Sequence, residues 1–417
     1  MKALVLGSGV IGITTAWYLA EAGYEVTVVD RQANPGMETS FSNGGQISWG
    51  SATPWAAPHT PMLALKWLFK PHAPLILRPR FDPAMWSWLF RMLRECTHER
   101  FVINRQRMVR MSRYSHDCLV LLRSQTGIQY DQSSGGLLTV YREQANLDEG
   151  AHDAHVLDAL GIPFRILDRA QCIAQEPGLA DVAHKIVGGI HYPEDECGDC
   201  IKFTQALAIL GQKRGVRLTM STTIERLLVA GDRLEGVQTN RGRLDADVYV
   251  LACGSYSPLL LRPHGIDLPV YPIKGYSMTV PVVDAASAPR STVTDDRHKV
   301  VMTRLGDRVR IAGIAELAGY DLVPRAARFE AQEFVMRDLF PRAGDFARAE
   351  RWCGLRPMTP DNPPVVSATL YKNLFLNTGH GTQGWTMACG SGKFMADLIS
   401  GKHPDISAQD YALQRFG

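Results

Sequence analysis

Two short apolar runs frame the first thirty residues. Residues 2–6 and 25–29 are rich in Val and Leu, and Asp30 ends the second run. Between them, apolar side chains recur at helical spacing at Ile11, Ala16, Leu19 and Ala20. This order predicts a strand, a helix and a second buried strand, which is the unit from which parallel sheets are built.

The turn between the first strand and the helix has the glycine spacing of a dinucleotide site. Residues 7–12 read Gly-Ser-Gly-Val-Ile-Gly. In such a turn Gly7 permits the tight bend, Gly9 lets the backbone approach a pyrophosphate, and Gly12 lets helix and strand pack closely. The helix N-terminus favours phosphate, and the acid at position 30 disfavours the 2′-phosphate of NADP. This motif alone leaves NAD and FAD open, and a glycine-rich turn that binds nothing is the alternative.

Later segments favour the longer cofactor. A strand at 247–251 runs into Ala-Cys-Gly-Ser, and small residues fill the loop at 42–46. Near the C-terminus a second glycine-rich stretch, 377–384, precedes the apolar helix 385–399. A pyrophosphate and a bulky redox ring can use two such helix N-termini, whereas a nucleotide alone needs one. The alternative for the second stretch is a plain helix start.

Charge is unevenly distributed along the 417 residues. The net charge of +3 is too small to indicate a nucleic-acid binder. Residues 61–110 contain ten basic and three acidic side chains, a charge of +7, so the rest carries 3 − 7 = −4. Trp67–Phe69 and Trp86–Phe90 lie in this segment. One interpretation is a peripheral membrane patch with aromatics at headgroup level; the other is that the aromatics cap a domain core.

Cysteine spacing and hydropathy indicate an intracellular protein without a metal site. The eight cysteines are scattered, as is typical of free thiols in a cytosolic protein. Cys197 and Cys200 lack the second ligand pair of a zinc site, and a helix start is the simpler interpretation. Residues 3–20 are uncharged but contain three glycines within six residues, unlike a signal peptide or a membrane span. We expect a cytoplasmic protein, with peripheral contact to the cytoplasmic face of the inner membrane as one interpretation of 61–110.

Together these segments resemble the FAD-dependent D-amino acid dehydrogenase small-subunit family, within the wider D-amino acid oxidase and glycine oxidase group. The resemblance covers nearly the whole chain. It rests on residues 7–12, 42–46, 54–58, 198–200, 254–256, 271–276, 354–361 and 377–381. It implies FAD, oxidative deamination of D-amino acids to 2-oxo acids and ammonia, and electron transfer to a quinone or another respiratory-chain acceptor.

Three positions depart from the family pattern. Residues 49–51 read Trp-Gly-Ser where Pro-Gly-Tyr is expected, in a loop that we expect near the substrate. Cys197 stands in place of Thr, and Asn362-Pro363 replaces a turn that usually contains Gly. The first change puts the amino-acid preference in doubt rather than the reaction.

Amine oxidation at a flavin chiefly requires a clamp for the substrate carboxylate. Arg356 is the first candidate, because a planar guanidinium binds a carboxylate through two parallel hydrogen bonds. Its counterpart in the family's Gly-Leu-Arg-Pro motif binds the carboxylate. Tyr276 is the second candidate, and a buried tyrosine with a structural partner is its alternative. Lys274 and His380 are weaker candidates.

The expected cofactor-binding residues come from five segments. They are Gly7, Ser8, Gly9, Val10, Ile11, Gly12, Asp30, Arg31, Ser42, Asn43, Gly44, Gly45, Gln46, Gly254, His380, Gly381, Thr382, Gln383 and Gly384.

The expected fold is α/β. A discontinuous Rossmann-type FAD-binding domain takes residues 1–60, 195–268 and 352–417. An α+β substrate domain on a mostly antiparallel sheet takes 61–194 and 269–351. In that sheet the arginines that alternate with apolar residues are expected on the solvent face, namely Arg304, Arg308 and Arg310.

Three other functions fit the same sequence. One is an oxidase of the glycine or sarcosine type that uses O2. Another is an oxidase or dehydrogenase of D-proline-like amines. The third is a dinucleotide-binding subunit without turnover.

Overall fold

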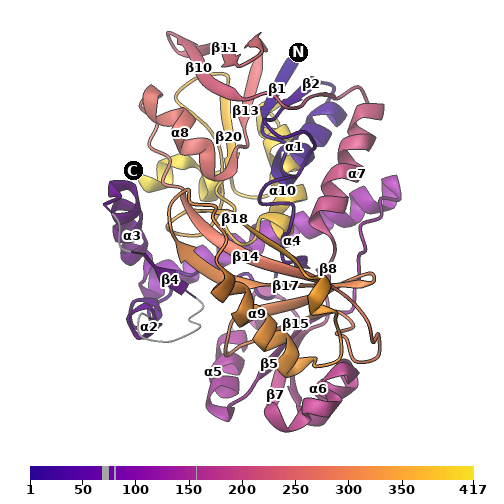
Figure 1. The fold of residues 1–417 in the computed structure, drawn as a ribbon. Coiled ribbons are helices and arrows are strands. Elements are labelled where there is room, and N and C mark those ends of the chain that lie inside the picture. The colour runs from indigo at the N-terminus through magenta and orange to yellow at the C-terminus, as the bar shows by residue number, and fades with distance from the viewer. Residues whose placement is uncertain (68–74, 79–80, 156) are drawn as a thin grey trace.

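The computed structural model describes residues 1–67, 75–78, 81–155 and 157–417 (Figure 1). Its α-helices are α1 (Val10–Glu21), α2 (Thr60–Trp67), α3 (Pro83–Glu95), α4 (His98–Thr126), α5 (Gln144–His155), α6 (Arg169–Gln175), α7 (Cys200–Lys213), α8 (Ser257–Leu261), α9 (Ala326–Leu339) and α10 (Gly384–Ile399).

The first sheet is the parallel one. Its strands, in spatial order, are β19 (Val365–Ala368), β20 (Leu374–Thr378), β13 (Val248–Leu251), β1 (Lys2–Leu6), β2 (Glu25–Val29) and β9 (Arg217–Thr219). All neighbours run parallel except β19, which pairs antiparallel with β20. The predicted strand, helix and strand are confirmed. Because α1 follows β1 and α10 follows β20, both helices begin at the carboxyl edge of the sheet, where ligands bind in such folds.

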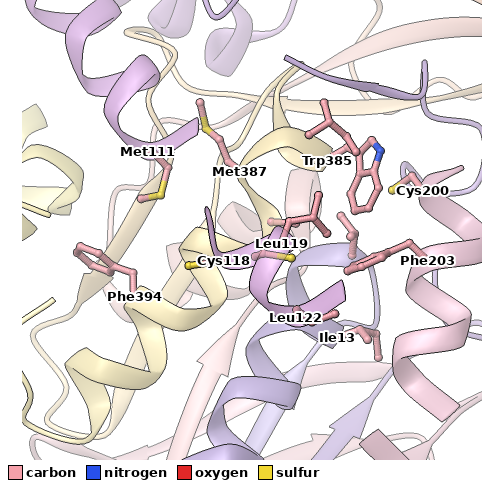
Figure 2. Packing of buried hydrophobic residues seen from close by; sticks show 14 of the residues in the cluster. Ile13, Met111, Cys118, Leu119, Leu122, Cys200, Phe203, Trp385, Met387 and Phe394 are labelled. Carbon is pink, nitrogen blue, oxygen red and sulfur yellow. The ribbon is translucent and has the colours of Figure 1, made fainter. Parts of the chain in front are cut away.

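Helices α1, α4, α7 and α10 form one apolar core beside this sheet. Figure 2 shows Trp385 of α10 beside Phe203 of α7, with their ring centroids 4.6 Å apart. The same cluster contains Leu119 of α4 and Ile13 of α1. A Cβ on Gly392 of α10 would lie 2.8 Å from the carbonyl carbon of Thr14 in α1, so these two helices are in close contact. Helix α4, expected in the substrate domain, therefore packs on the Rossmann side.

The second sheet is larger and mostly antiparallel. Its strands, in spatial order, are β18 (Glu350–Met358), β14 (Tyr271–Pro281), β17 (Arg308–Leu317), β16 (Val300–Leu305), β15 (Thr292–Asp295), β5 (Leu137–Tyr141), β7 (Gly188–Tyr192) and β6 (Arg165–Asp168), with β4 (Leu75–Leu77) beside β17. Strand β18 pairs with β14 along its whole length, although residues 352–358 were expected in the FAD domain. The chain crosses between the two sheets just after β18.

Two small sheets complete the fold. They are β10 (Ile224–Ala230), β11 (Arg233–Thr239) and β12 (Gly242–Leu244), and the pair β3 (Gln46–Ile47) and β8 (Glu196–Cys197). The architecture is the expected one, a Rossmann-type domain beside an α+β domain. Among the helices of the described residues, none combines the length and apolar character that a membrane crossing requires.

Candidate active site

A cavity opens at the carboxyl edge of the parallel sheet, where α1 and α10 begin. Eleven of the expected cofactor-binding residues line it: Gly7, Gly9, Val10, Ile11, Asp30, Arg31, Asn43, Gly254, His380, Gly381 and Gly384. The fold thus brings together segments from both ends and the middle of the chain. Ser8, Gly12, Ser42, Gly44, Gly45, Gln46, Thr382 and Gln383 are beside this wall rather than in it.

Two glycines fix the shape of the first turn. Gly7 has φ +108°, and a Cβ there would lie 2.6 Å from the carbonyl oxygen of Ala252. A Cβ on Gly12 would lie 1.9 Å from the carbonyl oxygen of Gly7. Helix α1 starts directly after this turn without an acidic side chain in its first turn, so its partial positive charge is available to a phosphate. These residues fit a dinucleotide pyrophosphate.

Asp30 lies in the cavity wall but is already hydrogen-bonded. One carboxylate oxygen accepts the backbone N–H of Ser8 at 2.6 Å and its hydroxyl at 2.8 Å, and the other accepts the N–H of Gln32 at 2.8 Å. Ser8 therefore holds Asp30 in place instead of facing the ligand. Oδ1 accepts only one of these bonds, so its second lone pair is available to a ribose hydroxyl.

The part of the cavity wall around Arg31 includes residues that were not predicted. Arg31 stacks on the ring of Tyr256, 4.0 Å from its centroid, and its Nε pairs with Glu38 at 2.6 Å. Glu38, Tyr256 and residues 223–225 line the same wall. They come from segments without a recognisable motif, apart from the 254–256 stretch of the family resemblance.

The loop 42–46 lies against the larger sheet. The amide oxygen of Asn43 accepts the N–H of Gly45 at 2.9 Å, and Ser42 accepts the hydroxyl of Ser277 at 2.8 Å. Arg310 is buried beneath this loop and donates to the carbonyl oxygen of Asn43 at 2.9 Å. The expectation that Arg310 faces solvent is wrong, because the loop covers that part of the sheet.

Arg356 lies on β18 between Leu355 and Pro357, which line the cavity, but it is not in the cavity wall itself. Its Nη1 donates to the carbonyl oxygen of Ile314 at 3.2 Å, and its side chain makes no other hydrogen bond to the described residues. Across the described residues it forms no ion pair with a carboxylate. Burial lowers the pKa of Arg356 to about 10, which reflects a partly dehydrated charge without an anionic neighbour. Such a guanidinium can receive a carboxylate ligand.

Tyr276 does not lie with Arg356. Arg356 is opposite Ile273 in the β14–β18 register, whereas Tyr276 is opposite Cys353. Side chains three residues apart on a strand point to opposite faces, so the two candidates face away from each other. The Tyr276 ring packs against Phe329 of α9, and its hydroxyl donates to Glu316 at 2.6 Å. The structure thus supports the alternative for Tyr276, a buried tyrosine with a structural partner.

The two weaker candidates also differ in position. Lys274 shares the face of Tyr276, is fully buried and donates to the carbonyl oxygen of Val323. His380 is in the cavity wall, with its Nε2 3.1 Å from the hydroxyl of Ser391. Burial lowers the pKa of His380 to about 3, so this imidazole is neutral at physiological pH.

The positions that depart from the family pattern have structural explanations. Trp49 is buried and stacks on His116 with ring centroids 4.1 Å apart, so the loop 49–51 contributes to the core. Asn362 adopts φ +81°, the left-handed region that asparagine tolerates better than most residues. Its amide oxygen also accepts the N–H of Trp55 at 2.8 Å, a bond that glycine could not make.

Cys197 ends strand β8, and Cys200 begins helix α7. Asp199 caps α7 by accepting the N–H of Ile201 at 3.3 Å, and both cysteines are buried and form no disulfide. Within the described ranges, no group of three or more His, Cys, Asp or Glu side chains is arranged to hold a metal ion.

Comparison with known proteins places this geometry in a family. The model of the FAD dependent oxidoreductase family matches residues 2–398. The chain belongs to this family. FAD is therefore the cofactor for which the cavity is built, and the chain is an oxidoreductase.

Two relatives are similar over their full length. The D-amino acid dehydrogenase of Rhizorhabdus wittichii is 55% identical over 418 residues, covering 100% of both chains. That of Agrobacterium fabrum is 54% identical over 416 residues, again covering 100% of both. Among solved structures, L-proline dehydrogenase from P. horikoshii superposes with a TM-score of 0.77 at 19% identity, covering 100% of this chain and 97% of the other. Glycine oxidase from Bacillus cereus gives 0.74 at 21%, covering 98% and 97%. These structures share the fold.

Proposed function

We propose that this chain is a D-amino acid dehydrogenase that converts D-amino acids to 2-oxo acids and ammonia. The observation that carries the proposal is Arg356, a guanidinium on β18 that has no anionic partner among the described residues. Its strand neighbours Leu355 and Pro357 line the FAD cavity. Full-length relatives at 54–55% identity with that name support it.

The residues of this chain bind and orient the substrate. Bound FAD supplies the two-electron acceptor. Arg356 would hold the carboxylate through two parallel hydrogen bonds and so direct the Cα–H bond toward the cofactor. The substrate loses a hydride from Cα and a proton from nitrogen, and water then splits the resulting imine into the 2-oxo acid and ammonia.

Anaerobic reduction of the holoenzyme tests the substrate class. D-Alanine or another D-amino acid should bleach the flavin absorbance under argon, while the matching L-isomers and glycine should leave it unchanged. Bleaching by glycine or sarcosine alone would point to an amine oxidase of that type, and bleaching by D-proline alone to a cyclic-amine enzyme. If no amine bleaches the flavin of an intact holoenzyme, the chain is a non-catalytic FAD-binding subunit.

The electron acceptor is a quinone or some other acceptor that is not oxygen. Substrate-reduced enzyme should regain its absorbance slowly in air-saturated buffer and quickly when a soluble quinone is added. Rapid return in air without quinone would identify an oxidase and contradict this part of the proposal.

Helix α3 is the surface that fits a peripheral membrane contact. Its Met85, Trp88 and Met92 are buried, whereas Phe90 and Leu93 are 64% and 54% exposed. Phe81, just before the helix, is fully exposed. An apolar stripe on an exposed helix suits the headgroup region of a bilayer, which would bring a lipid quinone near the enzyme.

Electrostatics supports this contact less than the sequence suggested. Arg91 pairs with Asp267, Arg100 with Glu95, and both Arg107 and Arg110 with Asp410. Leu68, Phe69 and the side chain of Trp67 lie outside the described residues. The apolar stripe is therefore the part of the segment that the structure supports best.

Vesicle co-sedimentation tests the stripe. The holoenzyme should sediment with phosphatidylglycerol vesicles, and Phe90→Ser with Leu93→Ser should remain in the supernatant. The matched control is Leu370→Ser, which removes a 61% exposed leucine on another surface and should sediment like the wild type. Equal recovery of all three proteins in the supernatant would refute the membrane contact.

A further inference from the structure

We infer that Gly275 and Ile314 are positioning residues, which together hold the guanidinium of Arg356 in place and leave one edge of it for the substrate carboxylate. This inference rests on the proposed role of Arg356 in binding that carboxylate.

Ile314 is an extra residue in β17. Gly275 of β14 is opposite Ala315 and Tyr276 is opposite Gly313, so Ile314 forms a β-bulge between them. Its φ is +52°, a left-handed conformation that is a rare outlier for a β-branched residue. Its side chain is 5% exposed and packs in the core of the larger sheet, which helps hold the backbone there. Strain of this kind persists where the surrounding structure imposes it, often at functional sites.

The bulge gives a carbonyl group a new partner. A regular antiparallel pair would use the carbonyl of this position within the sheet or direct it at the neighbouring strand. Here the carbonyl oxygen of Ile314 accepts Nη1 of Arg356, which belongs to β18, two strands away. The bulge therefore anchors the guanidinium from one side.

Gly275 provides the space in which the guanidinium lies. Its φ is outside the left-handed region, so the backbone does not require glycine there. A Cβ would, however, lie 2.5 Å from both Cζ and Nη1 of Arg356 and 2.8 Å from Nη2. The flat guanidinium therefore rests directly on the backbone of β14. Any side chain at position 275 would lift it away from the carbonyl of Ile314.

The two supports leave a defined edge free. Nη1 is held by the bulge, and no hydrogen bond to another described residue is recorded for Nε or Nη2. An Nε–Nη2 pair is one of the two-donor edges that match a carboxylate. The geometry thus favours side-on binding of the substrate carboxylate at that edge.

A double-mutant cycle tests the inference without relying on turnover. The probe is benzoate, a carboxylate that cannot be oxidised at Cα, and its dissociation constant is measured from the change in flavin absorbance of the holoenzyme. Gly275→Ala should weaken benzoate binding about tenfold or more, because a shift of this size misplaces both donors. FAD content and Tm should stay close to the wild-type values. Gly211→Ala in α7, where a Cβ would make an ordinary 3.4 Å contact, is the control and should bind benzoate normally.

The Gly275→Ala substitution in an Arg356→Met background tests whether Gly275 affects benzoate binding through Arg356 or independently of it. If Gly275 acts through Arg356, then Gly275→Ala should cause no further loss in Arg356→Met. Should Gly275→Ala alone fail to retain FAD, the double variant should recover it, because the clash partner is gone. Equal losses from Gly275→Ala in both backgrounds would overturn the inference, and so would normal benzoate binding by Gly275→Ala. Normal binding by Arg356→Met itself would instead overturn the proposed role of Arg356.

Discussion

Both faces of the β14–β18 pair carry buried polar side chains, but these side chains differ in how many hydrogen-bond partners they have within the protein. On one face, the side chain of Arg356 lies over Gly275 and, among the described residues, has a single hydrogen bond and no carboxylate partner. On the other, the buried Glu316 accepts the hydroxyl of Tyr276 and Nε of Arg78. Lys274, also on that face, donates to the carbonyl oxygen of Val323.

We propose that this difference separates a ligand-binding residue, Arg356, from residues that stabilise the sheet. A buried polar group normally has its hydrogen bonds made within the protein, because leaving them unmade is costly. On the face of Tyr276, Glu316 and Lys274 follow that rule, although Oε1 of Gln332 and Nε of Arg325 beside them have no hydrogen-bond partner in the described part of the chain. The face of Arg356 leaves donors unused, and a ligand carboxylate would complete them.

The largest expected effect is at Arg356. Arg356→Lys keeps the positive charge but loses the planar fork, so at least one of the two hydrogen bonds to the carboxylate should be lost. A charge-assisted bond contributes about 1.5–3 kcal/mol, so kcat/KM for a D-amino acid should fall roughly tenfold to a hundredfold. Anaerobic rapid-mixing measurements of flavin reduction give this value directly.

The control is in the same experiment. FAD content and Tm of Arg356→Lys should remain near wild type, because the guanidinium makes one internal bond only. If Arg356→Lys keeps a near-normal kcat/KM, Arg356 is not the carboxylate-binding residue, and its face of the sheet has no proposed function.

Local signals account for what could be predicted from the sequence. The turn around Gly7 and Gly12, the acid at position 30 and the second helix start at Gly384 are each marked by a short stretch of sequence. Glycine spacing of this kind predicts a tight turn and a helix start, and the structure has both. The Gly-Leu-Arg-Pro motif also indicated Arg356 as the first candidate for the carboxylate-binding residue.

Features that depend on contacts between distant segments, such as strand register, could not be predicted from local sequence. Tyr276 lies in a strong motif, but its face is decided by the β14–β18 register. Arg310 alternates with apolar residues as an exposed residue would, yet a loop from the other end of the chain covers it. The bulge at Ile314 has no sequence signature, since a β-branched residue is the last type expected at positive φ.

The next effect in size is on stability, at Tyr276. Tyr276→Phe removes the hydroxyl that donates to Glu316 and leaves part of a buried carboxylate unsatisfied. Such a loss costs about 1–3 kcal/mol, so Tm should fall by a few degrees in thermal unfolding of the holoenzyme. The kcat/KM should stay near wild type, because the phenol faces away from Arg356. A large loss of kcat/KM with unchanged Tm would instead place Tyr276 in the active site. It would contradict the proposal that only the face of Arg356 binds substrate.

The smallest expected effect is a pH dependence of stability from Glu316. Burial alone would raise the pKa of this carboxyl, but the bonds from Tyr276 and Arg78 outweigh burial and hold its pKa below the ordinary value of 4.5. Its contribution to stability is therefore fully present above about pH 4.5 and is lost as the pH falls through the lower pKa of the folded state. Glu316→Gln lacks this ionisation while its amide oxygen can still accept the hydroxyl of Tyr276. The difference in Tm between wild type and Glu316→Gln should thus be largest near pH 6 and shrink toward pH 3. A difference that stays constant over that range would mean that Glu316 is not stabilised as a carboxylate, and that the polar groups on the face of Tyr276 are less completely paired than the geometry indicates.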